Sequence, residues 1–203
     1  IHSTLPERAM IEESIGLSLD VAPLVVSIHP VTLQDDTVHD AEVLFESLES
    51  IERPCAICCP NADVGCERIL ELAKAHCVNH RHAVLHRNLD HLVYWGLLQH
   101  AAALVGNSSS GIMETPSIKL PCVNIGERQR GRIRAMNIID VHADVQLIAS
   151  AIDRAVDPDF RASLSGMSSP YGDGESAGRI CDALAESYSA STLLKKQIRL
   201  SPT

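Results

Sequence analysis

Short runs of apolar and β-branched residues alternate along this chain with longer segments whose apolar residues recur at the helical period. Strands that are apolar on both faces are typical of parallel sheets, because helices cover both faces of such sheets. Right-handed crossovers then join one strand to the next. The pattern predicts an α/β fold, a Rossmann-like doubly wound parallel sheet of about six strands. The strands are expected at 24–29, 55–59 and 83–86, and near Leu104, Val123 and Ile139.

The segments between these runs carry the start and stop signals of helices. Thr4 and Pro6 open a helix that runs through residue 15 and is closed by Gly16. The polar run 35–37 is expected to cap the helix that follows it. Further helices are expected around 69–77, over 92–100, from 109 and over 145–156, and two helical segments are expected after the irregular loop 165–174.

Composition bounds the class of protein. The chain has 203 residues, of which 45% are hydrophobic, so one domain can bury a sizeable core. The formal net charge of −9 argues against nucleic acid or an anionic membrane as a partner. The seven cysteines lack the spacing of a disulfide scaffold, which favours reduced thiols and a cytoplasmic location. No transmembrane run or signal peptide is recognisable, and a chain that begins at Ile1 is expected to be a piece of a longer protein.

The segment 102–114 carries the most specific chemistry. An apolar run ends in a turn rich in serine, and a short helix with Glu114 inside it is expected to follow. The unpaired N–H groups of a helix start and the hydroxyls of the three serines 108–110 suit a phosphate or diphosphate. Gly111 would let such a ligand approach the backbone, and Glu114 would accept hydrogen bonds from the hydroxyls of a ribose. The alternative is a serine N-cap on a purely structural helix.

Polar loops follow five of the expected strands, and ligands of open α/β sheets bind beyond the carboxyl ends of the strands. The five loops should therefore converge on one edge of the sheet. They are Ser27–Thr32 with His29, Cys59–Gly65 with Asn61, His86–Leu89, Asn107–Gly111, and Gly126–Arg132 with Arg128.

Each of these features has a structural alternative. His29 could be a strand-end histidine satisfied by the backbone, and Asn61 and Asp63 could only cap the next helix. The alternating arginines 128, 130, 132 and 134 could lie on a solvated surface strand, although flanking glycines favour a shaped, phosphate-binding loop.

Two further clusters imitate metal or redox sites. The Cys55-x-x-Cys58 pair lies inside an expected strand, so core packing is the better interpretation. No metal site is expected from the histidines, because they spread over a helix end, a loop and a strand without ligand spacing. They are His76, His80, His82 and His86, with Cys77 alongside.

Several motifs, in this order along the chain, resemble the C-terminal half of the hydrolysing UDP-N-acetylglucosamine 2-epimerases of the sialic-acid-pathway type. The resemblance covers about Leu5 to Leu184. It implies one half of a glycosyltransferase-B architecture that binds UDP or UDP-N-acetylglucosamine and needs no cofactor or metal. The implied reaction eliminates UDP to a glycal and then adds water, which releases N-acetylmannosamine or an analogue. The motifs are Ser27–Thr32, Pro60–Gly65, Gly106–Glu114, Gly126–Arg132 and Pro170–Gly174.

The resemblance also assigns roles to single residues. His29 would touch the diphosphate and assist the departure of UDP, and Ser108 and Ser109 would hold the diphosphate with Arg128 beside it. Glu114 would hold the ribose. Asn61 and the backbone near Leu89 would lie along the nucleotide.

The resemblance implies that the carboxylates acting at the sugar belong to an N-terminal domain that is missing here. Residues 1–20 would be the linker and first helix from that domain, 21–185 the UDP-binding domain, and 186–203 a C-terminal helical tail. The fragment is then expected to be inactive alone, and a homo-oligomer is left open. Two other functions stay open, a non-catalytic nucleotide-binding module and the nucleotide-sugar-binding half of a glycosyltransferase.

Overall fold

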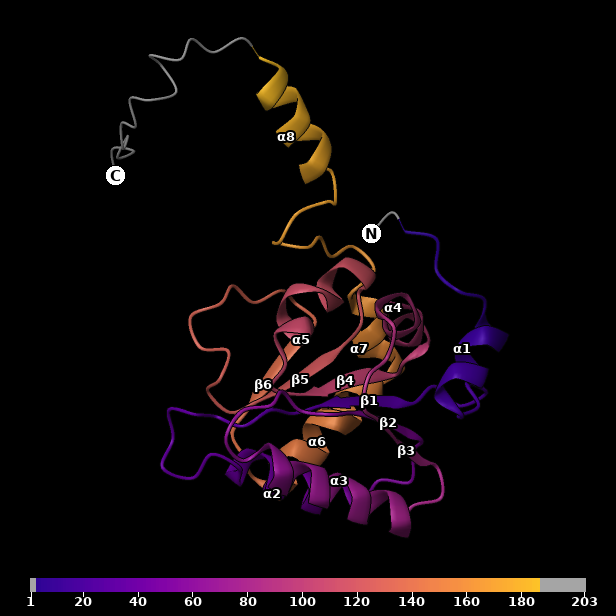
Figure 1. The fold of residues 1–203 in the computed structure, drawn as a ribbon, viewed down its shortest axis with the longest axis vertical. Coiled ribbons are helices and arrows are strands. Elements are labelled where there is room, and N and C mark those ends of the chain that lie inside the picture. Colours follow the sequence, from indigo (N-terminus) through magenta and orange to yellow (C-terminus); the bar gives the residue numbers. More distant parts are fainter. Residues whose placement is uncertain (1–2, 187–203) are drawn as a thin grey trace. The chain divides into compact units, whose positions relative to one another are not determined.

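In the computed structural model, which describes residues 3–186, six parallel strands form one sheet in the order β3-β2-β1-β4-β5-β6 (Figure 1). This order is that of a doubly wound sheet, so the predicted fold is confirmed. The strands are short and lie at the expected places, although the first two stop one or two residues earlier than predicted. They are β1 (Leu24–Ser27), β2 (Cys55–Cys58), β3 (Ala83–His86), β4 (Ala103–Gly106), β5 (Cys122–Ile125) and β6 (Ile138–Val141).

Helices cover both faces of the sheet. One face packs against α2 (His39–Leu48), α3 (Cys66–Asn79) and α6 (Val145–Val156). The other packs against α1 (Arg8–Ile15), α4 (His91–His100) and the short α5 (Ser109–Met113). The remaining elements are a 3₁₀ turn η1 (Thr115–Ile118), α7 (Pro158–Ser163) and α8 (Ser176–Ala185).

The alternation of side chains along β1 divides the core. Leu24 and Val26 join the apolar cluster under α2, α3 and α6, whereas Val25 joins the cluster under α1 and α4. All three side chains are fully buried, with 0% exposure. This two-sided burial explains why the strands read as continuous apolar runs.

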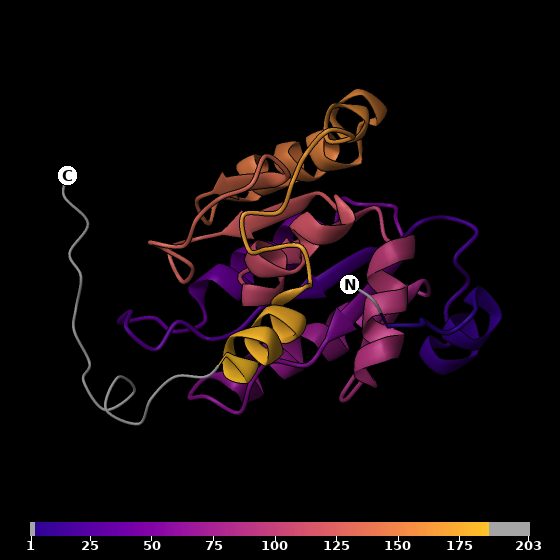
Figure 2. The same cartoon turned by 90° about the horizontal axis from the view of Figure 1, so that it is seen from above.

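The first helix is part of the core. Ile11 and Ile15 of α1 are buried and join Leu97 and Leu98 of α4, and the two helices lie side by side in both views (Figures 1 and 2). Gly16 ends α1 in the left-handed conformation, with φ of 63°, as predicted.

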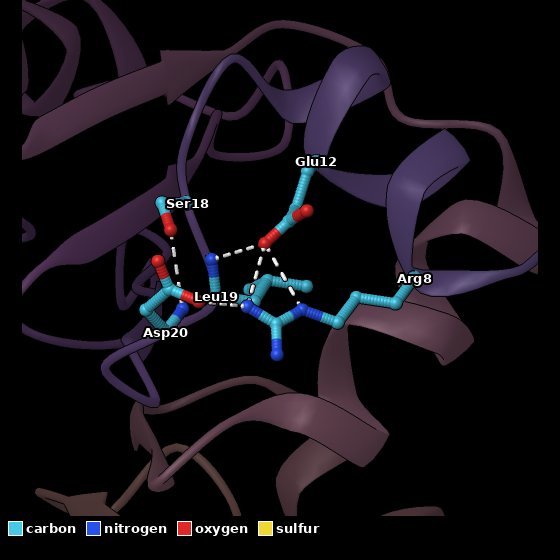
Figure 3. Close-up of polar contacts among 5 residues, drawn as sticks. All are labelled: Arg8, Glu12, Ser18, Leu19 and Asp20. Carbon is cyan, nitrogen blue, oxygen red and sulfur yellow. Dashed lines mark hydrogen bonds and ion pairs between the residues drawn. The ribbon is translucent and has the colours of Figure 1, made fainter.

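A polar network ties α1 to the segment that enters β1 (Figure 3). Glu12 Oε1 accepts hydrogen bonds from the Leu19 N–H at 2.8 Å and from Arg8 Nη2 at 2.9 Å. Arg8 also pairs with Asp20, whose N–H donates to Ser18 Oγ. The Leu19 N–H, with help from Arg8, lowers the pKa of Glu12. The network lies at the surface and fixes the turn between the helix and the sheet.

Other details differ from the predictions. The polar run 35–37 does not cap α2, because the N-cap residue is Val38. Asp36 lies two residues before the N-cap and accepts from the Val38 N–H, not from an N–H within the helix. The helix α7 was not expected. One of the two helical segments expected after residue 174 is α8, and the other falls in 187–203, outside the described residues.

The chain divides into two compact units, residues 2–171 and a second that begins at Gly172. In the second unit, α8 has no buried side chain, and Arg179 forms an ion pair with Asp173 at 2.6 Å. No helix among residues 3–186 is long and apolar enough to cross a membrane.

Candidate functional site

The site lies where β1 and β4 run side by side, at the point where the chain order of the strands reverses. Such a switch point leaves a crevice beyond the carboxyl ends of the two strands, because their connections leave in opposite directions. Gly106 ends β4 with φ of 140°, and a Cβ there would lie 2.1 Å from the Ser27 carbonyl oxygen of β1. The glycine therefore allows the two strand ends to meet.

Asn107 joins the two loops that follow. Its side-chain carbonyl accepts from the His29 N–H at 2.8 Å, and its amide donates to the His29 carbonyl at 2.9 Å. Asn107 is fully buried, with 0% exposure, so the pairing is shielded from water. The loop carrying His29 and the loop carrying Ser108 are held together by one side chain.

His29 is a buried, neutral imidazole. The Asn61 N–H donates to its Nδ1 at 3.0 Å, and a backbone N–H can only donate, so the imidazole proton lies on Nε2. Burial, with a contribution from the charge of Arg128 opposed by Asp63, lowers the pKa of His29 to about 4. At neutral pH, Nε2–H is a hydrogen-bond donor beside Ser27 Oγ, 3.5 Å away.

The helix start after β4 follows the prediction in part. Ser108 Oγ accepts from the Ser110 N–H at 3.3 Å, so the N-cap interpretation holds for Ser108, which also lines the cleft described below. The expectation for Gly111 is wrong. A Cβ on Gly111 would lie 2.5 Å from Cys122 Sγ and 3.0 Å from Leu104 Cδ2, so this glycine lets α5 pack on the sheet rather than admitting a ligand.

Glu114 belongs to a chain of hydroxyl groups. Ser110 Oγ donates to Glu114 Oε2 at 2.8 Å and lies 2.9 Å from the hydroxyl of Tyr94. Burial raises the pKa of Tyr94 far above its usual value, so the phenol stays protonated and can act as a donor. The role of Tyr94 was missed from the sequence, because Tyr94 lies on a different helix from Ser110.

The loop after β5 brings a guanidinium to the same place. Arg128 Nη1 and Gln129 Nε2 both donate to the Asn107 carbonyl, at 3.1 and 2.8 Å. Burial lowers the pKa of Arg128, although a guanidinium remains charged. The segment is a turn and not the surface strand of the alternative. Arg130 is exposed at the surface, and Arg134 is paired with Asp140 at 2.9 Å.

Two adjoining hollows result, and they share Ser109 and Arg128. The first, of about 330 Å³, collects six of the seven predicted site residues, and the second, of about 530 Å³, extends along residues 30–34 to Arg132. Leu89 lines neither hollow, and its side chain packs against the core under α4, whereas the role expected for the backbone near Leu89 stays a prediction. The first hollow is lined by Ser27, His29, Asn61, His91, Tyr94, Trp95, Ser108, Ser109, Ser110, Glu114 and Arg128.

The other sequence alternatives are settled by the geometry. Asn61 and Asp63 do not cap α3, whose N-cap is Gly65 without a side-chain bond. Cys55 and Cys58 lie in β2, and burial raises the pKa of both thiols to about 12, as expected for core cysteines. All seven cysteines are unpaired.

Comparison with known proteins gives the same fold and a family. Residues 3–185 match the family model described as UDP-N-acetylglucosamine 2-epimerase. Among curated proteins, a GDP/UDP-N,N'-diacetylbacillosamine 2-epimerase (hydrolyzing) of Campylobacter jejuni is 34% identical over 154 residues, which is 74% of this chain and 40% of the relative. The polysialic acid biosynthesis protein P7 of Escherichia coli is 33% identical over 82% of this chain and 43% of its own length.

Solved structures agree in fold. A UDP-N-acetylglucosamine 2-epimerase from Listeria monocytogenes superposes with a TM-score of 0.65 at 18% identity, covering 90% of this chain and 48% of the other. One from Neisseria meningitidis, bound to UDP-GlcNAc, has a TM-score of 0.63 at 13% identity over 88% of this chain and 48% of its own. The chain thus spans less than half the length of these relatives, and over nearly all of its own length it belongs to the UDP-N-acetylglucosamine 2-epimerase family.

Proposed function

We propose that this chain is the UDP-binding half of a hydrolysing UDP-N-acetylglucosamine 2-epimerase with the glycosyltransferase-B architecture. One observation carries the proposal: His29, Asn61, Arg128 and the segment 108–114 come from four separate parts of the chain and line one cleft at the switch point. Convergence of donors from separate loops indicates a ligand site better than any one of them, because each alone has a structural explanation.

The diphosphate is placed among His29 Nε2–H, the hydroxyl of Ser109 and the guanidinium of Arg128. Charge builds on this diphosphate as UDP leaves the sugar, and donors that are already oriented stabilise it without reorganisation. His29 serves as a neutral hydrogen-bond donor, because its pKa of about 4 leaves no imidazolium to act as an acid at neutral pH in the free protein. The help that His29 gives to the departure of UDP is therefore proposed to be a hydrogen bond and not the transfer of a proton.

The nucleoside is placed beside Glu114 and Trp95. The Glu114 carboxylate already accepts from Ser110 and has further lone pairs for a ribose diol. Trp95 is half-buried and lines the same cleft, so its ring offers a surface on which a base can stack.

The complete reaction is proposed to be elimination of UDP followed by hydration of the glycal. The groups that move protons at the sugar are assigned to a second domain, preceding the 1–20 segment, which packs across this cleft. Two curated relatives that are named as hydrolysing 2-epimerases, from Campylobacter jejuni and Legionella pneumophila, support this reaction, and the chain covers 40% of the first and 49% of the second.

Calorimetry with UDP tests the binding. The chain is expected to bind UDP, and Arg128→Ala should weaken binding by about tenfold to a hundredfold, since a charge-assisted hydrogen bond is worth ~1.5–3 kcal/mol. Arg130→Ala is the matched control, because its side chain is 85% exposed two residues away and lines neither hollow. Absence of UDP binding at millimolar concentration would refute the proposal.

Turnover separates the remaining functions. The chain alone is expected not to release UDP from UDP-N-acetylglucosamine, whereas adding the upstream domain should restore release of UDP and free sugar. Release of UDP only with an acceptor sugar would indicate a glycosyltransferase half instead.

A further inference from the structure

A second cluster of ligating side chains lies at the opposite edge of the sheet from the nucleotide cleft. Glu49 follows the end of α2, His76 lies in the last turn of α3 and His80 directly follows α3. The chain enters β3 at Ala83, so this cluster is at the amino ends of the strands, whereas the cleft is at their carboxyl ends. Nothing in the proposed reaction uses these residues.

The three side chains converge on one point. His76 Nδ1 lies 3.3 Å from Glu49 Oε1, and His80 Nε2 lies 3.2 Å from Glu49 Oε2. The ligating atoms all lie within 4.8 Å of one another. These two contacts are hydrogen bonds between the histidines and the two carboxylate oxygens. A tetrahedral zinc ion with bonds of 2.0–2.1 Å separates neighbouring ligand atoms by about 3.4 Å, so an ion could replace the shared protons with little movement of the side chains.

The surroundings hold the cluster in place and leave it open. The His76 side chain is only 3% exposed, and its ring contacts Phe45 of α2 with a centroid distance of 5.9 Å. The rings of His76 and His80 stack at 4.1 Å. His76 and His80 line a hollow of about 620 Å³, which gives an ion a route to the two imidazoles and room for water as a further ligand. The His80 and Glu49 side chains are 29% and 52% exposed.

Charge also favours a cation at this point. The carboxyl-terminal ends of α2 and α3 meet here, and both present the negative end of the helix dipole. Two arginines, Arg53 and Arg81, also line the hollow and keep their positive charge, but they donate to the Ala22 carbonyl at 2.9 Å and to His82 Nε2 at 3.1 Å and form no ion pair with Glu49 among the described residues. Two imidazoles and one carboxylate form a ligand set that zinc uses in proteins.

We propose that Glu49, His76 and His80 bind one divalent cation of the zinc type, which ties the end of α2 to the end of α3. His76 and His80 are four residues apart at the end of α3, a spacing that is visible in the sequence. The third ligand, Glu49, directly follows α2 and stands 27 residues before His76, so no local spacing in the sequence connects it with the two histidines.

The test is titration of the tag-free, chelator-treated chain with zinc sulfate under reducing conditions. One ion is expected to bind with low-micromolar affinity or better. Glu49→Ala and His80→Ala should each weaken it at least tenfold, because each removes a direct ligand. His82→Ala should leave it within twofold, since His82 lines the same hollow outside the cluster. All three altered side chains lie partly or fully at the surface, so the variants should fold.

Cobalt substitution gives a second readout. A nitrogen and oxygen site should show visible d–d bands without the thiolate charge-transfer band that the cysteines would produce. Failure to bind zinc at micromolar concentration, unchanged affinity in both ligand variants, or a thiolate band would overturn the proposal. UDP affinity should be the same in His80→Ala as in the wild type, so this test is independent of the nucleotide site.

Discussion

The buried imidazole of His29 makes the stability of this protein depend on pH in a calculable way. The pKa of His29 is about 4 in the folded chain and 6.5 at its ordinary value. Between these values the unfolded chain binds more protons, so stability falls as pH falls and levels off below about 4. With these pKa values for His29 in the folded and the unfolded chain, the free energy of unfolding falls by about 2 kcal/mol from pH 7.5 to 5, and by about 3 kcal/mol by pH 4.

The variant His29→Gln removes the titrating group. Urea unfolding of the wild type and of this variant at a series of pH values measures the contribution of His29. Burial also lowers the pKa values of His76 and His86, but both residues remain in the variant, so their effects cancel in the difference. The free energy of unfolding of the wild type should fall by about 2 kcal/mol more than that of the variant between pH 7.5 and 5. Parallel pH profiles would refute the assignment of a neutral, desolvated imidazole.

Two further predictions concern the same cleft. Gly106→Ala should destabilise the chain by about 3 kcal/mol or more, because its Cβ would meet the Ser27 carbonyl, whereas Gly131→Ala, also at positive φ but in open space, should cost about 1 kcal/mol in urea unfolding. Equal losses would contradict the close approach. Glu114→Gln should weaken UDP binding about tenfold and leave pyrophosphate binding unchanged in calorimetry, since its carboxylate is assigned to the ribose; a loss for both ligands would place it elsewhere.

The sheet was predictable because each buried strand is a short apolar run that can be recognised from its own residues, without knowledge of what packs against it. The convergence of His29, Asn61 and Arg128 was predictable for a related reason, since parallel strands end at one edge and their loops must meet there. No contact partner had to be known for either inference.

The parts that could not be predicted depend on tertiary neighbours. Gly111 was assigned to a ligand, but the space beside it is filled by Cys122, which follows in the chain by 11 positions and in a different element. Tyr94 reaches Ser110 from another helix, and Leu89 turns into the core. Local pattern carries no information about which distant side chain occupies such a space.

The double hydrogen bond of the Asn107 amide has a consequence for recognition. Because this one side chain spans the gap between two loops, imidazole and serine donors are presented as a single rigid block before any ligand arrives. Little conformational freedom is then lost on binding, which leaves more of the interaction energy available as affinity. A shift of either loop must also displace the other, so the positions of His29 and Ser108 are coupled through Asn107.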